Sequence, residues 1–471
     1  MLSYFQRKKP QNFSWIPSNP VPHSHLDLAG KLLLQHEIPY SEKDLQMLLS
    51  ERIITKTESM EQHLFQTCCR RCGNTQAHLF AELPHQTCGK TCVYCRNCIQ
   101  MGRVLECEPL YIGSANVQWP VYEDPCAWKG TLTPGQQRAA DDLTAQVQKG
   151  SGEHLVWAVC GAGKTEVLFP AITKALETGK RICLATPRTD VVRELQPRLQ
   201  KAFPEVDTAA LYGDSPDKNG RAPFVIATTH QLFRYAHAFD VLIIDEVDAF
   251  PFHNDPTLHF AAKRAAKPDA AIIYLTATPR KEQKRRLRQK SLPVTFIPRR
   301  FHGHPLPVPA LKLTPMLHRS LNKGQLPAHL LRTIAAQQTT ARQLLLFLPS
   351  IKKAEEIASF LKEAGYEVKS VHAEDDHRAE KIQSFRNKEY RILVTTTILE
   401  RGVTFPSVDV YVIDAGHVVF DEAALVQIAG RAGRSADDPD GDVRFYHIGK
   451  TDEMLDAVEA VKKMNKLGQK L

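Results

Sequence analysis

A lysine and a threonine behind a glycine-rich turn are the first residues whose types and spacing could do chemistry. The turn follows the apolar run HLVWAV (154–159) and precedes a helical pattern that starts at Glu166. Backbone N–H groups of such a turn surround phosphate oxygens, while the lysine and the threonine hydroxyl serve the β/γ-phosphates and Mg²⁺. Ala158 replaces the usual first glycine and is still small. We therefore expect ATP to bind at Cys160, Gly161, Ala162, Gly163, Lys164 and Thr165.

An acidic pair follows the later apolar run VLII (241–244). Alone, Asp245 and Glu246 would fit a solvated strand end. Beside a phosphate-binding loop, however, we expect Asp245 to hold Mg²⁺ through water, together with Thr165, and Glu246 to polarise the attacking water. Gln136, in the segment LTPGQQ, is expected to contact adenine or to cap a helix with Thr133, and both roles can hold together.

Two arginines far downstream suggest that a second lobe completes this site. Arg431 and Arg434 lie three residues apart in QIAGRAGR (427–434), with Gln427 one turn earlier, so they share one face of a helix or helical turn. A two-lobed ATPase needs such residues to reach across a cleft to the γ-phosphate. A solvated basic face is the alternative, but the small residues between the arginines favour close approach to another surface. The predicted catalytic residues are Lys164, Asp245, Glu246, Gln427, Arg431 and Arg434.

Two series of short apolar runs must position these groups. The first has five runs between residues 154 and 278, and the second has four between 342 and 416, after a basic, proline-rich stretch at 298–309. Polar helical patterns separate the runs, which is typical of parallel sheets with crossover helices. We predict an α/β chain with two lobes, 129–304 and 305–471, preceded by an N-terminal arm (1–65) and a cysteine-rich module (66–128).

Hydroxyl and arginine side chains follow several of the predicted strands. In parallel sheets these strand ends meet at one edge, where such groups suit contact with a nucleic-acid backbone. The expected backbone contacts are Arg188, Thr228, Thr229, Thr395, Thr396 and Arg401. Thr276 and Thr278 are expected to hydrogen-bond the acidic pair Asp245–Glu246. Through these bonds they would transmit the state of the pair.

Eight of the eleven cysteines lie between Cys68 and Cys107. In a long chain of this kind, such a cluster favours a metal over disulfides. The knuckles CRRC (69–72) and CRNC (95–98) have the spacing of a zinc ribbon, and zinc would fold a module too small for its own core. Which cysteines bind zinc stays open, because Cys92-x-x-Cys95 is an equally good knuckle. The extra thiols Cys68, Cys88, Cys92 and Cys107 leave room for one or two zinc sites.

Composition restricts the partners. The net charge of +9 favours a polyanion such as nucleic acid or an anionic membrane surface. No apolar run reaches the roughly 20 residues that span a bilayer, and no signal-peptide core follows the first residues, so a cytoplasmic protein is expected. The basic run 281–290 fits a solvated helix face better than a contact with DNA or membrane.

The ordered series LTPGQ, AVCGAGKT, ATPR, ATTH, DEVD, TAT, TTTILERGVTF and QIAGRAGR resembles superfamily-two helicases and translocases. That resemblance implies RecA-like lobes, and DEVD departs from the DEAD and DEAH boxes of RNA helicases. With the cysteine module, DEVDAFP and RRFHGHPL, the chain is similar to the late-competence ComFA family of Gram-positive bacteria. The ComFA resemblance implies that the zinc ligands are Cys69, Cys72, Cys95 and Cys98.

The same resemblance implies an ATPase stimulated by single-stranded DNA, peripheral at the inner face of the cell membrane. It would help to pull transforming DNA through a membrane uptake channel, together with other competence proteins. An oligomer is one option that the sequence leaves open. Two other functions share the motifs: a replication-restart or RNA helicase that unwinds duplexes, and an ATP-switched zinc adaptor that binds protein partners.

Overall fold

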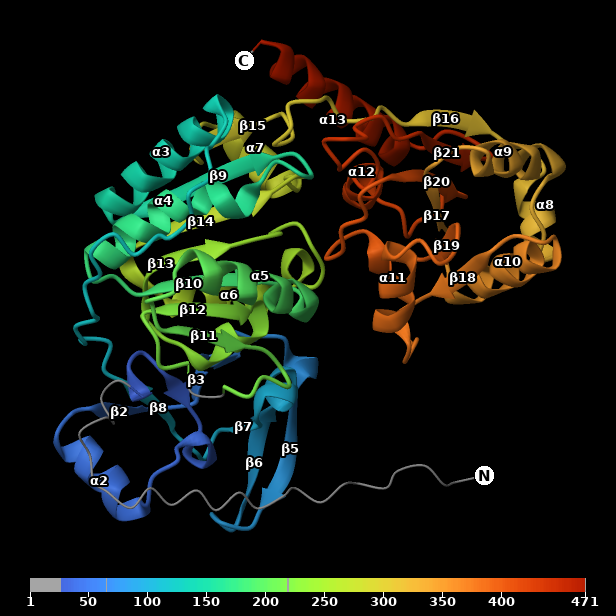
Figure 1. Cartoon of the computed structure of the whole chain (residues 1–471). Coiled ribbons are helices and arrows are strands. Elements are labelled where there is room, and N and C mark those ends of the chain that lie inside the picture. Colours follow the sequence, from blue (N-terminus) through green and yellow to red (C-terminus); the bar gives the residue numbers. More distant parts are fainter. Residues whose placement is uncertain (1–26, 65, 218–219, 471) are drawn as a thin grey trace.

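The computed structural model describes residues 27–64, 66–217 and 220–470. Figure 1 shows an N-terminal domain below a first sheet with its helices, and a second sheet with its helices beside the first. All ladders of both large sheets are parallel, so the carboxyl ends of the strands share an edge in each lobe. This confirms the predicted class of two RecA-like lobes.

The first lobe has a seven-stranded sheet in the order β11-β12-β10-β13-β14-β9-β15. Its strands are β9 (Gly152–Ala158), β10 (Ile182–Thr186), β11 (Thr208–Leu211), β12 (Phe224–Thr228), β13 (Phe239–Ile244), β14 (Ala266–Thr276) and β15 (Val294–Ile297). One face packs on α3 (Pro134–Lys149), α4 (Lys164–Glu177) and α5 (Thr189–Ala202). The other packs on α6 (Pro256–Ala265) and the N-terminal domain. The basic run forms α7 (Lys281–Arg288), which has no buried residue.

The second lobe has a six-stranded sheet in the order β16-β21-β20-β17-β19-β18. Its strands are β16 (Ala310–Leu313), β17 (Gln343–Phe347), β18 (Val368–Val371), β19 (Ile392–Thr395), β20 (Val408–Ile413) and β21 (Val443–His447). One face packs on α8 (Leu317–Asn322), α9 (Ala328–Gln338) and α10 (Ile351–Glu363). The other packs on α11 (Arg378–Arg386) and α12 (Glu422–Ala429).

The N-terminal domain does not follow the predicted boundary at residue 65. Strands β1 (Leu32–Leu33) and β2 (Ile54–Thr57) both pair with β8 (Leu110–Gly113), so the described part of the predicted arm and the cysteine module share a sheet. Helix α2 (Glu42–Ser50) packs beside them. The clustered cysteines extend from β4 (Thr67–Cys69), which pairs with β3 (Met60–Gln62), through β5 (Phe80–His85) and β6 (Lys90–Cys95) to just beyond β7 (Val104–Leu105). Six short 3-10 helices complete the described chain: η1 (Gln35–Glu37), η2 (Ala77–Leu79), η3 (Arg96–Met101), η4 (Thr229–Arg234), η5 (Phe252–Asn254) and η6 (Thr397–Leu399).

The last helix, α13 (Asp452–Gln469), belongs to both lobes. Met454 and Ala457 in its first half lie in the core of the second lobe. Val461 and Met464 in its second half lie in the core of the first lobe. Figure 1 shows this helix along the side where the two lobes meet.

Candidate nucleotide site between the lobes

The phosphate-binding loop joins β9 to α4, as predicted. Gly161 and Gly163 have φ values of 79° and 69°, in the left-handed region that favours glycine. A Cβ on Gly163 would lie 2.5 Å from Nε2 of Gln136, so the glycine also allows a close approach. Lys164 begins α4, with its Nζ 3.7 Å from Oδ1 of Asp245. The loop thus has the backbone and the charge that a triphosphate requires.

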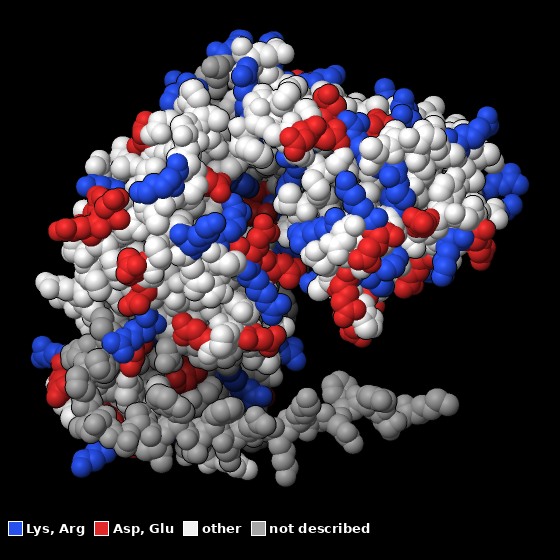
Figure 2. All heavy atoms as spheres, viewed as in Figure 1, with Lys and Arg blue, Asp and Glu red and all other residues white. Residues whose placement is uncertain are grey.

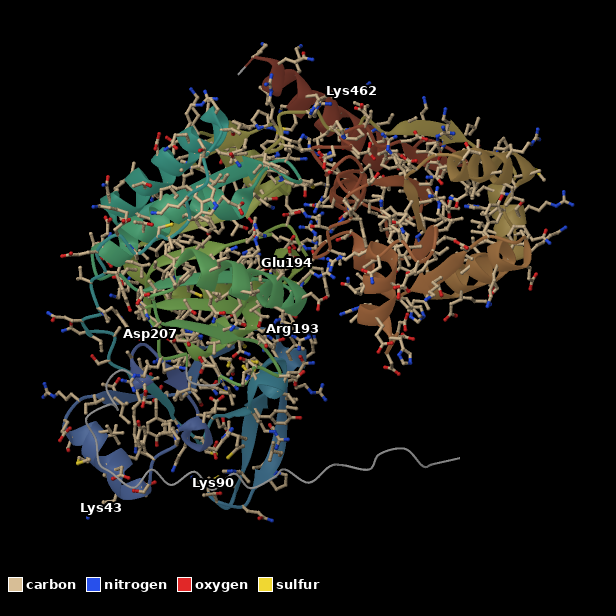
Figure 3. All side chains as sticks on the ribbon, in the orientation of Figure 1. Lys43, Lys90, Arg193, Glu194, Asp207 and Lys462 are labelled. Atoms are coloured by element: carbon tan, nitrogen blue, oxygen red, sulfur yellow. The ribbon has the colours of Figure 1, made fainter. Side chains whose placement is uncertain are left out.

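A cleft of about 490 Å³ runs from this loop to the second lobe. Glu194 of α5 lies on the edge of the first lobe that faces the second (Figure 3) and lines the cleft. Figure 2 shows the surface hollowed between the lobes, with charges of both signs on its walls. The predicted residues that line the cleft are Gln136, Cys160, Gly161, Ala162, Gly163, Lys164, Thr165, Asp245, Glu246, Gln427, Arg431 and Arg434. Residues from both series of motifs therefore face one space.

Lys164 keeps its charge although it is half-buried. Burial alone would lower the pKa of Lys164, but the carboxylates of Asp245 and Glu246 outweigh it and raise that pKa above its ordinary value. Burial raises the pKa of Asp245, and Lys164 opposes that shift. Asp245 and Thr165 are oxygen donors of the kind that Mg²⁺ prefers, and both line the cleft.

Gln136 caps α3, as one of its two predicted roles requires. The backbone N–H of Thr133 donates to Oε1 of Gln136 at 2.8 Å, and that of Gln136 donates to the Thr133 hydroxyl at 3.4 Å. The Gln136 amide also donates to the carbonyl of Ala162 at 2.9 Å. One side chain thus joins the start of α3 to the phosphate loop, and its adenine contact stays a prediction.

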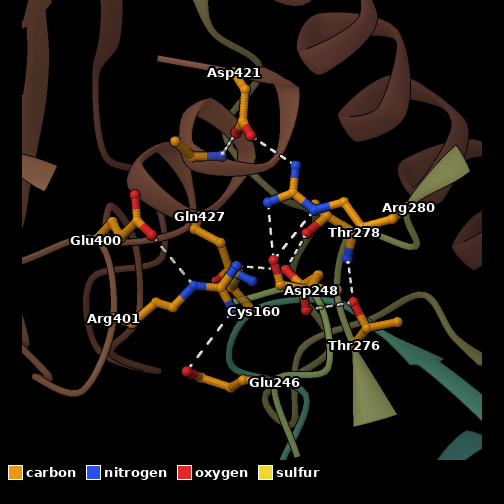
Figure 4. A network of polar contacts seen from close by, with 12 residues as sticks. Cys160, Glu246, Asp248, Thr276, Thr278, Arg280, Glu400, Arg401, Asp421 and Gln427 are labelled. Carbon is orange, nitrogen blue, oxygen red and sulfur yellow. Dashed lines mark hydrogen bonds and ion pairs between the residues drawn. The ribbon is translucent and has the colours of Figure 1, made fainter. Parts of the chain in front are cut away.

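Asp248 is the centre of a buried network that the sequence did not assign (Figure 4). Its carboxylate accepts hydrogen bonds from Thr276 Oγ1 at 2.6 Å and from Thr278 Oγ1 at 2.5 Å. It also pairs with Arg401 of the second lobe. The two threonines were expected to bond the acidic pair Asp245–Glu246, but their partner is this third carboxylate. The only available signal was the acidic residue that ends DEVD.

Arg401 has a different place from the predicted DNA contact. Its side chain is 2% exposed, and Nη1 lies 3.7 Å from Oε2 of Glu246. A guanidinium enclosed by Asp248 and Glu246 cannot reach a strand in this arrangement. We therefore correct its role: Arg401 joins the second lobe to the two carboxylates of the first.

The other predicted backbone contacts lie at strand ends. Thr228 ends β12, Thr229 follows it, and Thr395 ends β19; all three are buried, while Thr396 is half-buried. The Thr395 hydroxyl donates to the carbonyl of Val371 at 2.9 Å. Arg188 donates to the carbonyl of Ile398 in the second lobe at 3.0 Å. Their contact with nucleic acid remains a prediction.

Arg431 and Arg434 lie in a turn after α12, which ends at Ala429, and not on the helix itself. Arg431 Nε donates to the carbonyl of Glu400 at 3.1 Å, and Arg434 Nε donates to that of Gly430 at the same distance. Burial and the neighbouring Arg434 lower the pKa of Arg431. An anion in the cleft would relieve this unfavourable burial of positive charge.

The turn packs directly on the phosphate loop. The Cys160 thiol donates to Oε1 of Gln427 at 2.9 Å. A Cβ on Gly430 would lie 2.5 Å from the Cβ of Cys160, so only glycine allows this approach. Arg300, from the connection between the lobes, is 1% exposed and donates to the carbonyl of Ala432 at 2.7 Å and to that of Gly433. No role was predicted for Arg300, since a lone arginine in a basic stretch carries no signal.

Two ion pairs also join the lobes beside this network. Arg280 donates to the Asp248 carbonyl at 2.8 Å and pairs with Asp421, the N-cap of α12, at 2.6 Å. Lys284 of α7 pairs with Glu422 at 2.7 Å. The basic helix α7 is thus partly exposed, as expected, and is also a contact between the lobes.

The four cysteines implied as zinc ligands lie together in the N-terminal domain. The Sγ atoms of Cys69, Cys72, Cys95 and Cys98 are within 4.8 Å of one another. Those of Cys69 and Cys98 are 3.8 Å apart, and those of Cys72 and Cys95 are 3.5 Å apart. Tetrahedral zinc with Zn–S bonds of about 2.3 Å requires sulfur separations of about 3.8 Å. The residues present therefore fit zinc, and Cys68 lies outside this group.

Family models match three stretches of the chain. The competence protein ComFA N-terminal domain matches residues 20–112, the type III restriction enzyme res subunit matches 129–281, and the helicase conserved C-terminal domain matches 325–436. Among the described residues, no helix is long and apolar enough to cross a membrane.

Curated relatives match nearly the whole chain. The competence protein ComFA of Bacillus subtilis (strain 168) is 45% identical over 444 residues, which cover 94% of this chain and 95% of the relative. The ComFA of Streptococcus pneumoniae (strain ATCC BAA-255 / R6) is 39% identical, over 94% of this chain and 98% of the relative. A solved structure, S. cerevisiae Dbp5 bound to RNA and ADP BeF3, shares the fold with a TM-score of 0.51 at 16% identity, over 71% of this chain and 91% of that one. The chain therefore belongs to the ComFA family of competence proteins and, by its helicase domains, is an ATPase of superfamily two.

Proposed function

We propose that this competence ATPase is a single-stranded-DNA translocase that drives the uptake of transforming DNA. One observation carries the proposal: the phosphate loop with its acidic pair and the two arginines Arg431 and Arg434 line the same cleft from opposite lobes. Such a site makes ATP binding depend on the distance between the lobes. Hydrolysis can then be converted into a relative movement of the lobes along a strand.

The proposed mechanism assigns a role to each group. Backbone N–H groups of the loop and Lys164 bind the phosphates, while Thr165 and Asp245 hold Mg²⁺. Glu246 orients and polarises the attacking water. Arg431 and Arg434 neutralise charge that develops on the γ-phosphate, with Gln427 placed beside them. The network around Asp248 and Arg401 transmits the state of the acidic pair to the second lobe.

We further propose that the strand-end groups Arg188, Thr228, Thr229, Thr395 and Thr396 contact the DNA backbone, and that zinc at Cys69, Cys72, Cys95 and Cys98 holds the N-terminal domain in shape. We also propose a site of action at the inner face of the cell membrane, with the uptake channel and other competence proteins as partners. Pull-down of the channel by full-length protein, with a control that lacks the N-terminal domain, tests the partner.

The decisive experiment compares ATP turnover of the wild type and of Lys164→Ala, each with no nucleic acid, single-stranded DNA, duplex DNA or RNA. We expect single-stranded DNA to stimulate the wild type most, and Lys164→Ala to lose at least about 100-fold in turnover, because the phosphates lose a charged partner. Lys174→Ala, on the same helix but outside the cleft, is the matched control.

Each rival predicts a different result. Equal turnover of wild type and Lys164→Ala would refute the motor. Turnover that no nucleic acid changes would favour the ATP-switched zinc adaptor. Efficient strand displacement on duplexes, measured in parallel, would favour a helicase that unwinds.

A further inference from the structure

A second group of metal-binding side chains lies in the N-terminal domain, outside the four cysteines described above. His85, Cys88, Cys92 and Cys107 place one ligand atom each within 4.8 Å of the others. The Sγ atoms of Cys88 and Cys92 are 3.2 Å apart, and Sγ of Cys107 lies 3.2 Å from Nδ1 of His85. Three thiols and one imidazole are a ligand set that zinc commonly takes.

Separate elements bring these four side chains together. His85 ends β5, Cys88 lies in the turn that follows, and Cys92 is on β6, which pairs with β5. Cys107 comes two residues after β7, the neighbour of β6. Ligands from two paired strands, from the turn between them and from the segment after β7 meet only if the fold positions them, which is what a metal centre needs.

The orientation of the histidine ring supports metal binding. Nε2 of His85 lies 3.4 Å from a carboxylate oxygen of Glu108. A carboxylate there favours the tautomer with its proton on Nε2, which leaves the lone pair of Nδ1 directed at the thiols. Histidines that bind metals commonly donate their other ring N–H to a carboxylate in this way.

We infer that His85, Cys88, Cys92 and Cys107 form a second zinc site. The position of this site at the end of the β5–β6 hairpin indicates a structural role. Two of the six residues of β5 are exposed and the other four are only half-buried, and residues 86–91 are all exposed, so little apolar packing holds the end of this hairpin. Lys90 lies in the lower part of the N-terminal domain, away from both lobes (Figure 3). Zinc would fasten the hairpin end to the segment after β7 and keep it rigid.

The first test is the zinc content of purified full-length protein, measured by elemental mass spectrometry. We expect about two zinc ions per chain in the wild type and about one in His85→Gln, in Cys107→Ser and in Cys95→Ser. Cys68→Ser is the matched control, since this neighbouring thiol belongs to neither group, and it should keep about two. His85→Cys should also keep about two, because a fourth thiolate can replace the imidazole.

A second readout does not depend on counting metal. Removal of the second zinc in Cys107→Ser should accelerate tryptic cleavage at Lys90, while the rest of the chain keeps its cleavage pattern. About one zinc in the wild type, unchanged in His85→Gln, would overturn the inference. So would a mass that is lower by two hydrogens in denatured, unreduced protein, because Cys88 and Cys92 would then be a disulfide.

Discussion

At the scale of single residues, one buried carboxylate in the first lobe holds an arginine of the second. Burial alone would raise the pKa of Asp248, but Arg401 outweighs it and, with the hydroxyls of Thr276 and Thr278, holds that pKa well below its usual range. Asp248 is therefore charged at neutral pH, and it neutralises an arginine that belongs to the other lobe. Loss of one partner from a buried pair leaves the other charge uncompensated.

We therefore predict that Asp248→Asn uncouples the lobes. Arg401 would keep only Glu246 as a charged neighbour across the cleft, and it would draw that carboxylate away from its water. DNA-stimulated turnover should fall at least about ten-fold, while KM for ATP changes less than about three-fold, because the phosphate loop is intact. Steady-state kinetics with single-stranded DNA measure both. Asp240→Asn, at the other end of β13, is the control, and equal loss in both variants would contradict the role of Asp248.

The sequence could predict the loop and the acidic pair because their motifs are local. It could not predict the Asp248–Arg401 pair, whose members are 153 residues apart. It placed Arg401 on DNA because an arginine after a strand suits a phosphate as well as a carboxylate. Only the packing of the two lobes decides between these partners.

At the scale of elements, the arginine turn depends on Arg300. This side chain donates to the carbonyls of Gly430, Ala432 and Gly433, which the end of α12 leaves without helical partners. Burial lowers the pKa of Arg300 to about 10, so it still carries its charge at neutral pH. A planar guanidinium can serve three carbonyls, whereas an ammonium group on a flexible chain holds them less rigidly.

We predict that Arg300→Lys keeps the charge but loosens the turn. Arg431 and Arg434 would then be less well placed, so kcat should fall about ten-fold with little change in ATP affinity. Turnover and nucleotide binding by fluorescence titration separate the two effects. The exposed neighbour provides the control, and Arg299→Lys should behave as wild type. A loss of ATP affinity with unchanged kcat would show that Arg300 acts elsewhere.

Elements were predictable where apolar runs were long. The nine expected runs all contain strands, but the strands β11, β15, β16 and β21 lie outside these runs and were missed. The arginines were expected on one face of a helix or helical turn, and they lie in the turn that follows α12 after its C-cap Gly430. The part of the arm from residue 27 was separated from the cysteines because no local pattern shows that β1 and β2 pair with β8.

At the scale of the whole molecule, buried cations join the N-terminal domain to the first lobe. Arg181 directly precedes β10, and its guanidinium donates a hydrogen bond to the carbonyl of Ala29 at 2.8 Å. Lys31 lies over the ring of Tyr235, with Nζ 4.8 Å from its centre. Burial, together with Arg181 and Arg234, lowers the pKa of Lys31 to about 7.

This buried lysine predicts a pH dependence of stability. Its pKa is about 10.4 in an unfolded chain, so from pH 7 to 10 the unfolded state binds a proton that the folded state has released. The contribution of Lys31 therefore makes the protein more stable as pH rises, by up to about 1.4 kcal/mol per pH unit. Lys31→Met removes this contribution. The Tm of this variant should therefore exceed that of the wild type most near neutral pH, and the difference should shrink towards pH 9.

Thermal denaturation of both proteins across this range is the measurement. Lys56→Met, which replaces an exposed lysine on β2 of the same sheet, should run parallel to the wild type. If the Tm of Lys31→Met also followed that of the wild type at a constant difference across this pH range, Lys31 would be protonated in the folded protein throughout.

Helix α13 has a consequence for how the lobes can move. The chain passes from the first lobe to the second near residue 305, and α13 returns to the first lobe along the same side. Asn465 fastens the two crossings together, with hydrogen bonds of 2.8 and 2.9 Å to the backbone of Leu306. The two linked crossings lie on one side of the cleft and together form a hinge between the lobes. We therefore expect the lobes of the proposed motor to open on the opposite side, with little twisting or sliding.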